Sequence, residues 1–148
     1  MNPFRDPIVD DCVVDASVLA KLFLPEDGSV IAQALLRQVT GTRPLMRAVP
    51  SFAYVECANI FWKAVRRGTL ESDRARAHFQ RLLILPLTVW ASEELIERAL
   101  ELALSLGVTV YDAIYLALAE RLNVPLITAD AALVRRAAGT TLNVRPLQ

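Results

Sequence analysis

Short apolar runs alternate along the chain with longer segments in which apolar residues recur every three to four positions. The short runs are typical of strands buried on both faces, and the longer segments have the period of amphipathic helices. The predicted strands cover residues 12–17, 43–50, 85–89, 124–128 and 142–146, the last as an edge strand. The predicted helices cover residues 17–24, 26–39, 51–68, 70–85, 92–107, 109–123 and 130–139.

This alternation predicts an α/β fold, with a parallel sheet covered by helices on both faces. In such folds ligands bind beyond the carboxyl ends of the strands. Ser51, Ser72 and Ser92 are candidate N-caps for three of the helices. The helix at 109–123 has two candidate caps, Thr109 and Asp112, depending on where it starts.

Length and composition place the chain among ordinary globular proteins. Its 148 residues are predicted to form one domain, 1–148, and 54% of them are hydrophobic, which permits a substantial core. No apolar run reaches the roughly 18 to 20 residues that span a membrane, and the N-terminus lacks the pattern of a secretory signal. We therefore expect a cytoplasmic protein that does not associate with membranes. Cys12 and Cys57 lack metal-binding spacing and are expected to be small buried residues.

The charges balance, with 16 basic and 16 acidic residues and a formal net charge of zero. Bulk charge therefore does not predict nucleic-acid binding, and such a partner must be held by a local patch or by a metal. The large apolar fraction and the absence of net charge favour self-association or a tight partner.

Four carboxylates do not fit the polar faces of the predicted elements. Asp15 and Asp130 stand at the carboxyl ends of two predicted strands, Glu56 lies in the middle of an apolar helix, and Asp112 opens another. An ionised group in apolar surroundings is costly unless it is paired or bound to metal. Each of the four has a simpler interpretation: the three aspartates as helix caps, and Glu56 as an ion-pair partner of Lys63 or an arginine.

No His, Lys or Arg is embedded in apolar sequence in the way these four acids are, so a buried cluster of them would contain acids only. Like charges at close range cannot all ionise without a counter-charge. A hard divalent cation held by oxygen ligands, Mg²⁺ or Mn²⁺, is the natural neutraliser. Such cations often also bind a substrate phosphate, and they activate water and stabilise charge on phosphate oxygens.

At these residues the chain resembles the PIN-domain family, and within it the VapC-type toxin ribonucleases. The matching segments are "VVDASVLAKLFLPE", "PSFAYVECANIFWKAVRRG", "YDAIYLALAERLNVPLITAD" and the following "AALVRRA". The resemblance implies a three-layer α/β/α sandwich around a parallel sheet. It also implies Mg²⁺- or Mn²⁺-dependent cleavage of RNA and a cognate antitoxin whose C-terminal segment covers the site. A homodimer is expected from the large apolar fraction and the absence of net charge.

The family's acidic quartet corresponds to Asp15, Glu56, Asp112 and Asp130, and its usual hydroxyl residue corresponds to Ser17. We expect the three aspartates to hold the metal directly or through water. Glu56 would complete the shell or orient the attacking water, and Ser17 would support a ligand or a phosphate oxygen.

Arginines are the other candidate functional residues. Arg66, Arg67 and Arg135 are candidate contacts to the RNA backbone, although exposed arginine is more often simply solvated. The single histidine, His78, is expected to be a surface or half-buried structural residue rather than a catalytic base.

Three alternative functions remain open. A phosphatase of the haloacid-dehalogenase kind needs a second Asp two places after the first, where this chain has Ser17. A catalytically silent PIN-fold interaction module would have no need of four costly carboxylates. A PIN ribonuclease that is not a toxin would have the same four acids as a toxin, so the site does not distinguish the two.

Overall fold

The computed structural model describes residues 10–25, 27–37 and 44–147. Within them the strands form one five-stranded sheet in the order β3-β2-β1-β4-β5, and all four neighbouring pairs are parallel. The strands are β1 (Cys12–Val14), β2 (Arg47–Pro50), β3 (Thr88–Trp90), β4 (Leu126–Thr128) and β5 (Val144–Pro146). Every predicted strand is present, shorter than predicted, and the predicted parallel sheet is confirmed.

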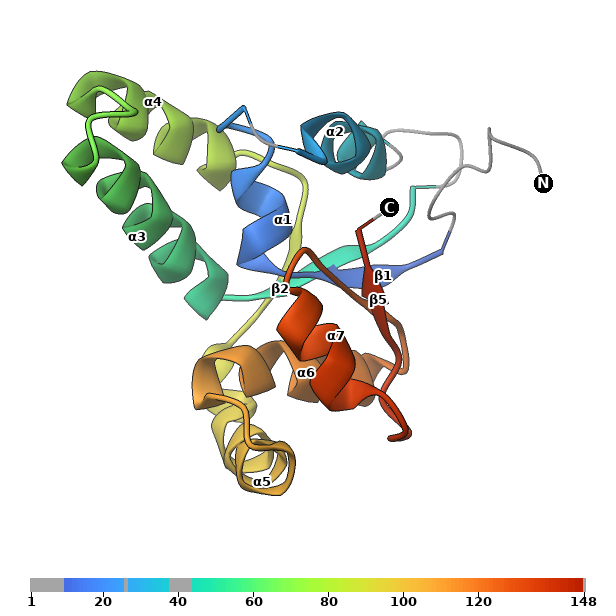
Figure 1. Cartoon of the computed structure of the whole chain (residues 1–148). Coiled ribbons are helices and arrows are strands. Elements are labelled where there is room, and N and C mark those ends of the chain that lie inside the picture. Colours follow the sequence, from blue (N-terminus) through green and yellow to red (C-terminus); the bar gives the residue numbers. More distant parts are fainter. Residues whose placement is uncertain (1–9, 26, 38–43, 148) are drawn as a thin grey trace.

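Helices cover both faces of this sheet (Figure 1). The helices are α1 (Ala16–Ala20), α2 (Ser29–Arg37), α3 (Phe52–Arg66), α4 (Ser72–Leu83), α5 (Ile96–Leu106), α6 (Val110–Leu122) and α7 (Ala131–Ala137), with a 3₁₀ turn at Ser92–Glu94. In Figure 1 helices α1 to α4 lie above the sheet and α5 to α7 lie below it. The three-layer α/β/α sandwich is therefore confirmed.

The strand order places a topological switch in the middle of the sheet. From β1 the chain moves to β2 and β3 on one side, and then returns to β4 and β5 on the other side. Because successive crossovers in opposite directions put their helices on opposite faces, the switch lies between β1 and β4, and ligands of such folds bind at the carboxyl ends of these strands. Both strands are fully buried, so the residues that follow them lie where the chain leaves the core.

Several helix boundaries differ from the predicted ones. Helix α1 ends at Ala20, and residues 21–23 form turns rather than a longer helix. The predicted helix at 26–39 is seen as Ser29–Arg37, and its predicted end at Gly41 lies outside the described residues. Ser72 is the first residue of α4, whose N-cap is Glu71, so the predicted Ser72 cap is wrong.

Ser92 was also predicted as a cap, and its observed role is different. It opens the 3₁₀ turn, and α5 starts only after Leu95. The Ser92 Oγ instead accepts a hydrogen bond from the backbone N–H of Phe52 at 2.8 Å and one from the Ser51 hydroxyl at 3.0 Å. Ser92 thus caps α3 from a distant part of the chain, whereas Ser51 makes no side-chain capping bond there.

Buried polar and thiol groups complete the core. Cys12 and Cys57 are free and fully buried, as predicted, and burial raises their thiol pKa values to about 11 and about 12. Arg47 on β2 is 1% exposed and donates to the carbonyl oxygens of Leu35 at 3.1 Å and Asp10 at 2.6 Å. No pattern in the sequence predicts this buried guanidinium, which ties α2 to the chain entering β1.

Within the described residues, no single helix combines the length and the apolar composition needed to cross a membrane. The pair α5 and α6 meets that test only jointly, and the two helices are bent by 112° relative to each other.

Candidate functional site

Asp15 leaves strand β1 and occupies the N-cap position of α1, but its side chain does not cap that helix. Its Oδ2 instead accepts hydrogen bonds from the Thr128 hydroxyl at 2.6 Å and the Ser17 hydroxyl at 3.1 Å. The carboxylate is buried, with the residue 6% exposed. Asp15 is therefore the N-cap residue of α1 by position, as predicted, while its carboxylate accepts from the hydroxyls of Thr128 and Ser17.

The same two hydroxyls connect β1 to the start of α7. The Ser17 Oγ accepts a hydrogen bond from the Ala129 N–H at 3.1 Å, and the Thr128 Oγ1 accepts one from the Asp130 N–H at 3.0 Å. The carboxyl ends of β1 and β4 are thus locked together through Asp15. Thr128 was missed by the sequence analysis, although a hydroxyl residue two places before a strand-end Asp was the available signal.

Asp130 does cap its helix. Its Oδ1 accepts hydrogen bonds from the N–H groups of Ala132 at 2.9 Å and Leu133 at 3.2 Å, so the capping interpretation is confirmed for this oxygen. The backbone of Asp130 is fixed in turn by Thr128, which places its carboxylate at the same sheet edge as Asp15.

Helices α6 and α3 carry the other two acids, Asp112 and Glu56 respectively. Thr109 is the N-cap of α6, and the Thr109 Oγ1 accepts a hydrogen bond from the Asp112 N–H at 3.2 Å. Of the two predicted candidate caps, Thr109 is therefore the correct one. On α3, the Glu56 Oε2 accepts a hydrogen bond from the Tyr115 hydroxyl at 2.6 Å. No contact of Glu56 with Lys63 or an arginine is found in the described part of the chain. Tyr115 is fully buried and was not predicted as part of the site.

The electrostatics of the acids show that they act on one another. Burial raises the pKa of Asp15, and the charge of Asp112 raises it further, against the two hydroxyl hydrogen bonds that lower it. Burial also raises the pKa of Glu56, to about 7, with the Tyr115 bond opposing and the charges of Asp15 and Asp112 adding to the rise. The pKa of Asp112 is raised by burial and by the charge of Asp130, while the Thr109 hydrogen bond lowers it. The four predicted acids therefore converge on one region of negative potential.

The donor set of this region is composed of carboxylate and hydroxyl oxygens. No three described His, Cys, Asp or Glu side chains form a ready-made metal-ligand cluster. Mg²⁺, however, keeps several of its waters and is commonly bound through only one or two carboxylates, so oxygen donors with excess negative charge fit such a hard cation.

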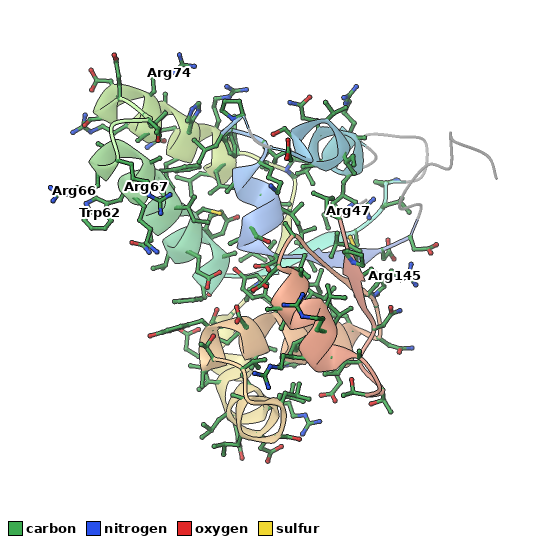
Figure 2. All side chains as sticks on the ribbon, viewed as in Figure 1. Arg47, Trp62, Arg66, Arg67, Arg74 and Arg145 are labelled. Atoms are coloured by element: carbon green, nitrogen blue, oxygen red, sulfur yellow. The ribbon has the colours of Figure 1, made fainter. Side chains whose placement is uncertain are left out.

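The predicted RNA-binding arginines lie at two different places. Arg66 and Arg67 end α3, roughly 15 Å along the helix axis from Glu56, and Arg135 lies in the last turn of α7. Figure 2 shows Arg66 and Arg67 on α3 beside Trp62, and the Arg66 Cζ lies 5.9 Å from the centroid of the Trp62 ring. Their contact with RNA stays a prediction.

His78 lies away from the acids, on α4. It is 7% exposed, more deeply buried than predicted, and its ring packs near those of Phe23 and Phe61 at 5.5 and 5.8 Å. Its Nδ1 has no hydrogen-bond partner within the described residues. Burial lowers its pKa, and the charges of Arg74 and Arg81 add to this effect.

Comparisons with known proteins agree with this fold. A model of the PIN domain matches residues 12–139. The sequence is 39% identical to Ribonuclease VapC3 of Pyrobaculum aerophilum over 126 residues, covering 84% of this chain and 92% of that protein. The chain therefore belongs to the PIN domain family, as the resemblance predicted.

Solved structures share the fold. The crystal structure of PAE2754 from Pyrobaculum aerophilum has a TM-score of 0.68 at 24% identity, covering 97% of this chain and 88% of that one. A toxin–antitoxin complex from Klebsiella pneumoniae has a TM-score of 0.59 at 20% identity, covering 93% of this chain and 98% of the matched chain.

Proposed function

We propose that this chain is a VapC-type endoribonuclease that hydrolyses RNA phosphodiester bonds and is the toxin of a toxin–antitoxin pair. The observation that carries the proposal is the buried carboxylate of Asp15 at the topological switch, with Glu56, Asp112 and Asp130 around it. The 39% identity to a protein named Ribonuclease VapC3 supports the same activity.

We assign the metal-holding role to Asp15, Asp112 and Asp130. A bound Mg²⁺ or Mn²⁺ would supply counter-charge and activate water next to the scissile phosphate. Ser17 and Thr128 keep the Asp15 carboxylate in one orientation through their hydroxyl donors. Glu56, with a pKa raised to about 7, is suited to accept a proton from the attacking water near neutral pH.

The main alternative is a silent interaction module of the same fold. A surface used only for binding does not need a buried carboxylate whose pKa is raised by burial and by neighbouring acids, and perturbed acids of this kind concentrate at functional sites. The phosphatase alternative lacks its second aspartate, because position 17 is a serine bonded to Asp15.

Purified protein and its Asp112→Asn variant test the activity directly. The wild type is expected to cut single-stranded RNA with Mg²⁺ or Mn²⁺ and to stop when EDTA is added. The variant is expected to be folded and at least about 100-fold slower, since one charged oxygen ligand is lost. Equal cleavage by both proteins, with contaminating nucleases excluded by a mock purification, would sink the proposal.

The toxin role and the partners need separate tests. Induction of the wild type in cells is expected to arrest growth, whereas induction of Asp112→Asn is not. A non-toxin ribonuclease would cut RNA in vitro without arresting growth. Co-expression with the small protein encoded next to this gene is expected to restore growth by forming a complex with the toxin, and sedimentation of the toxin alone tests the proposed homodimer.

A further inference from the structure

Two aromatic rings stack at the rim of the carboxylate site. The rings of Phe52 and Tyr111 have centroids 5.2 Å apart and planes within 11° of parallel. Tyr111 directly precedes Asp112 in the first turn of α6, and Phe52 begins α3. Since Phe52 lies four residues before Glu56, the two side chains share one face of α3. The ring pair therefore borders the acids on both helices.

One of the two rings remains largely open to solvent. Tyr111 is 60% exposed, although Phe52 covers one of its faces. Tyr115, one turn further along α6, is fully buried and donates its hydroxyl to Glu56. The two tyrosines of this helix thus have opposite environments, and Tyr111 does not belong to the hydrophobic core formed by the described residues.

Phe52, whose ring backs Tyr111, is anchored by hydrogen bonds at the start of α3. The N–H of Phe52 donates to the Ser92 Oγ at 2.8 Å, and the N–H of Ser92 donates to the Ser51 Oγ at 3.1 Å. The N–H of Ser51 donates to the carbonyl oxygen of Trp90 on β3 at 2.8 Å. The start of α3 is therefore fixed to the end of β3, and a ring fixed in advance loses little entropy when a ligand stacks on it.

The charge of the site explains why such a ring is needed. The carboxylates themselves repel the phosphates of an approaching RNA, so an uncharged contact beside them adds attraction that does not depend on the charge of the site. Every base has a π-face that stacks on an aromatic side chain, whatever the sequence. A paired base keeps both of its faces inside the helix, so an unpaired base is the one available.

We propose that the exposed face of Tyr111, backed by Phe52, stacks an unpaired base of the RNA next to the scissile phosphate. Tyr111 is then a positioning residue for single-stranded RNA. This inference rests on the proposed ribonuclease function, because it places the base beside the acids that would cut the strand.

A fluorescence experiment tests the stacking. The probe is a single-stranded RNA of ten nucleotides that carries 2-aminopurine at one position, moved along the strand in a series. The protein carries Asp15→Asn so that the probe is not cut. Stacking on Tyr111 is expected to quench the probe at one position in particular. The added substitution Tyr111→Leu is expected to abolish that quenching and weaken binding roughly tenfold, whereas Tyr111→Phe restores both because it retains the ring.

Cleavage kinetics, measured with proteins that retain the native Asp15, provide a second readout. Tyr111→Leu is expected to raise KM roughly tenfold with a smaller change in kcat, and Tyr111→Phe is expected to behave as the wild type. Leu104→Ala is the matched control, because Leu104 is 78% exposed on α5 and has no part in the site.

The outcomes separate the two proposals. If the wild type neither binds nor cuts the RNA, the ribonuclease function fails. If the wild type cuts normally and Tyr111→Leu has the same KM and the same quenching, the stacking role alone is overturned. Loss of self-association in Tyr111→Leu, with unchanged kinetics per site, would also overturn it, because the ring would then pack against a second copy of the chain.

Discussion

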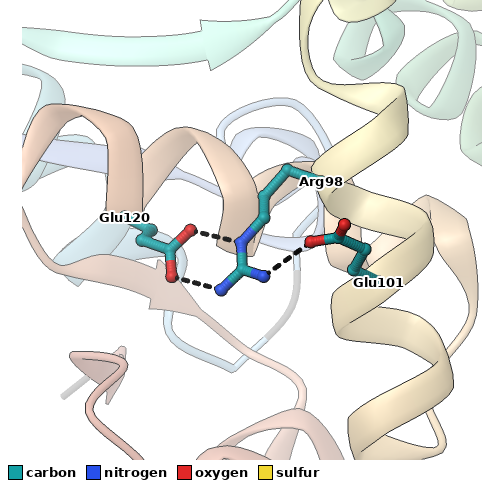
Figure 3. A network of polar contacts seen from close by, with 3 residues as sticks. All are labelled: Arg98, Glu101 and Glu120. Carbon is teal, nitrogen blue, oxygen red and sulfur yellow. Dashed lines mark hydrogen bonds and ion pairs between the residues drawn. The ribbon is translucent and has the colours of Figure 1, made fainter.

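Two groups of carboxylates in this molecule differ in the partners they find. Between α5 and α6, Arg98 donates to both oxygens of Glu120 at 2.8 Å and to Glu101 at 2.9 Å (Figure 3). This guanidinium lowers the pKa of Glu120. At the switch point, Glu56 accepts a hydrogen bond from the Tyr115 hydroxyl and has no other side-chain partner among the described residues, and burial raises its pKa to about 7.

The difference shows what each group does for the protein. Exposed acids paired with an arginine hold two helices together and gain from being charged. Buried acids without a cationic partner cost stability when they are charged, and they are retained where charge serves a ligand or a reaction. The following substitutions and conditions test this contrast, from the largest expected effect to the smallest.

Asp15→Asn is expected to have opposite effects on activity and on stability. Asn keeps an oxygen that accepts from Thr128 and Ser17 but removes the charge, so RNA cleavage should fall by roughly 100-fold or more. The melting temperature at pH 8 should not fall, because a buried charge is removed. Gel assays of RNA cleavage and thermal denaturation measure both. Glu120→Gln is the control, with normal cleavage expected, and full activity of Asp15→Asn would contradict the contrast.

Addition of Mn²⁺ is expected to supply the counter-charge that the switch-point acids lack. At a hundred times its Kd, one bound ion adds about 2.7 kcal/mol, or roughly 5 to 10 °C in melting temperature for a chain of this size. Asp112→Asn should lose most of this rise, and Arg98→Ala should keep it. An equal rise in the wild type and in Asp112→Asn would show that the ion binds elsewhere.

The pH dependence of stability without metal should reflect the raised pKa values of Asp15, Asp112 and Glu56, and Glu56 is the one of the three that can be followed near neutral pH. Its folded pKa of about 7 lies above the ordinary value of 4.5, so the folded state binds more protons between these two values. Raising the pH through this window should therefore lower the melting temperature by a few degrees. Glu56→Gln should flatten this part of the profile.

Glu120 provides the matched control for that profile. Its pKa is lowered, so its stabilising effect is present above its ordinary value of 4.5 and is lost at lower pH. Glu120→Gln should therefore lower the melting temperature at pH 7 and leave the slope between pH 5 and 7 unchanged. A flattened slope in Glu120→Gln instead of Glu56→Gln would reverse the assignment.

Arg98→Ala should have the smallest effect. The network is exposed, and we expect a decrease of about 1 to 3 °C in melting temperature, with unchanged RNA cleavage. High salt should shrink the difference, because it screens exposed pairs. The matched control is Arg76→Ala, which breaks an isolated exposed pair with Asp73 and should change nothing measurable.

The order of strands and helices could be predicted from periodicity, because each element carries its own pattern of apolar residues. The convergence of the acids could be predicted only as a hypothesis. Asp15 and Asp130 meet because β1 and β4 are neighbours, and nothing local to either strand encodes that adjacency. Family resemblance supplied what the local pattern did not.

Capping was the least predictable part of the site. The sequence predicts Ser92 as a helix N-cap, but its hydroxyl oxygen accepts a hydrogen bond from the N–H of Phe52, forty residues earlier. Asp15 reads as a cap, but the Thr128 hydroxyl draws its side chain toward β4. In both cases the side chain has a tertiary partner that the local sequence pattern does not reveal.

The hydrogen bond from Thr128 to Asp15 also has a consequence in time. It joins residues 113 positions apart in the chain. At about 5 to 20 residues per second, a ribosome adds Thr128 roughly 5 to 20 seconds after Asp15. During that interval Asp15 has neither this donor nor its neighbouring strand β4. A nascent chain therefore carries the first acid long before it carries a site, and the site is assembled only when the second half of the sheet docks.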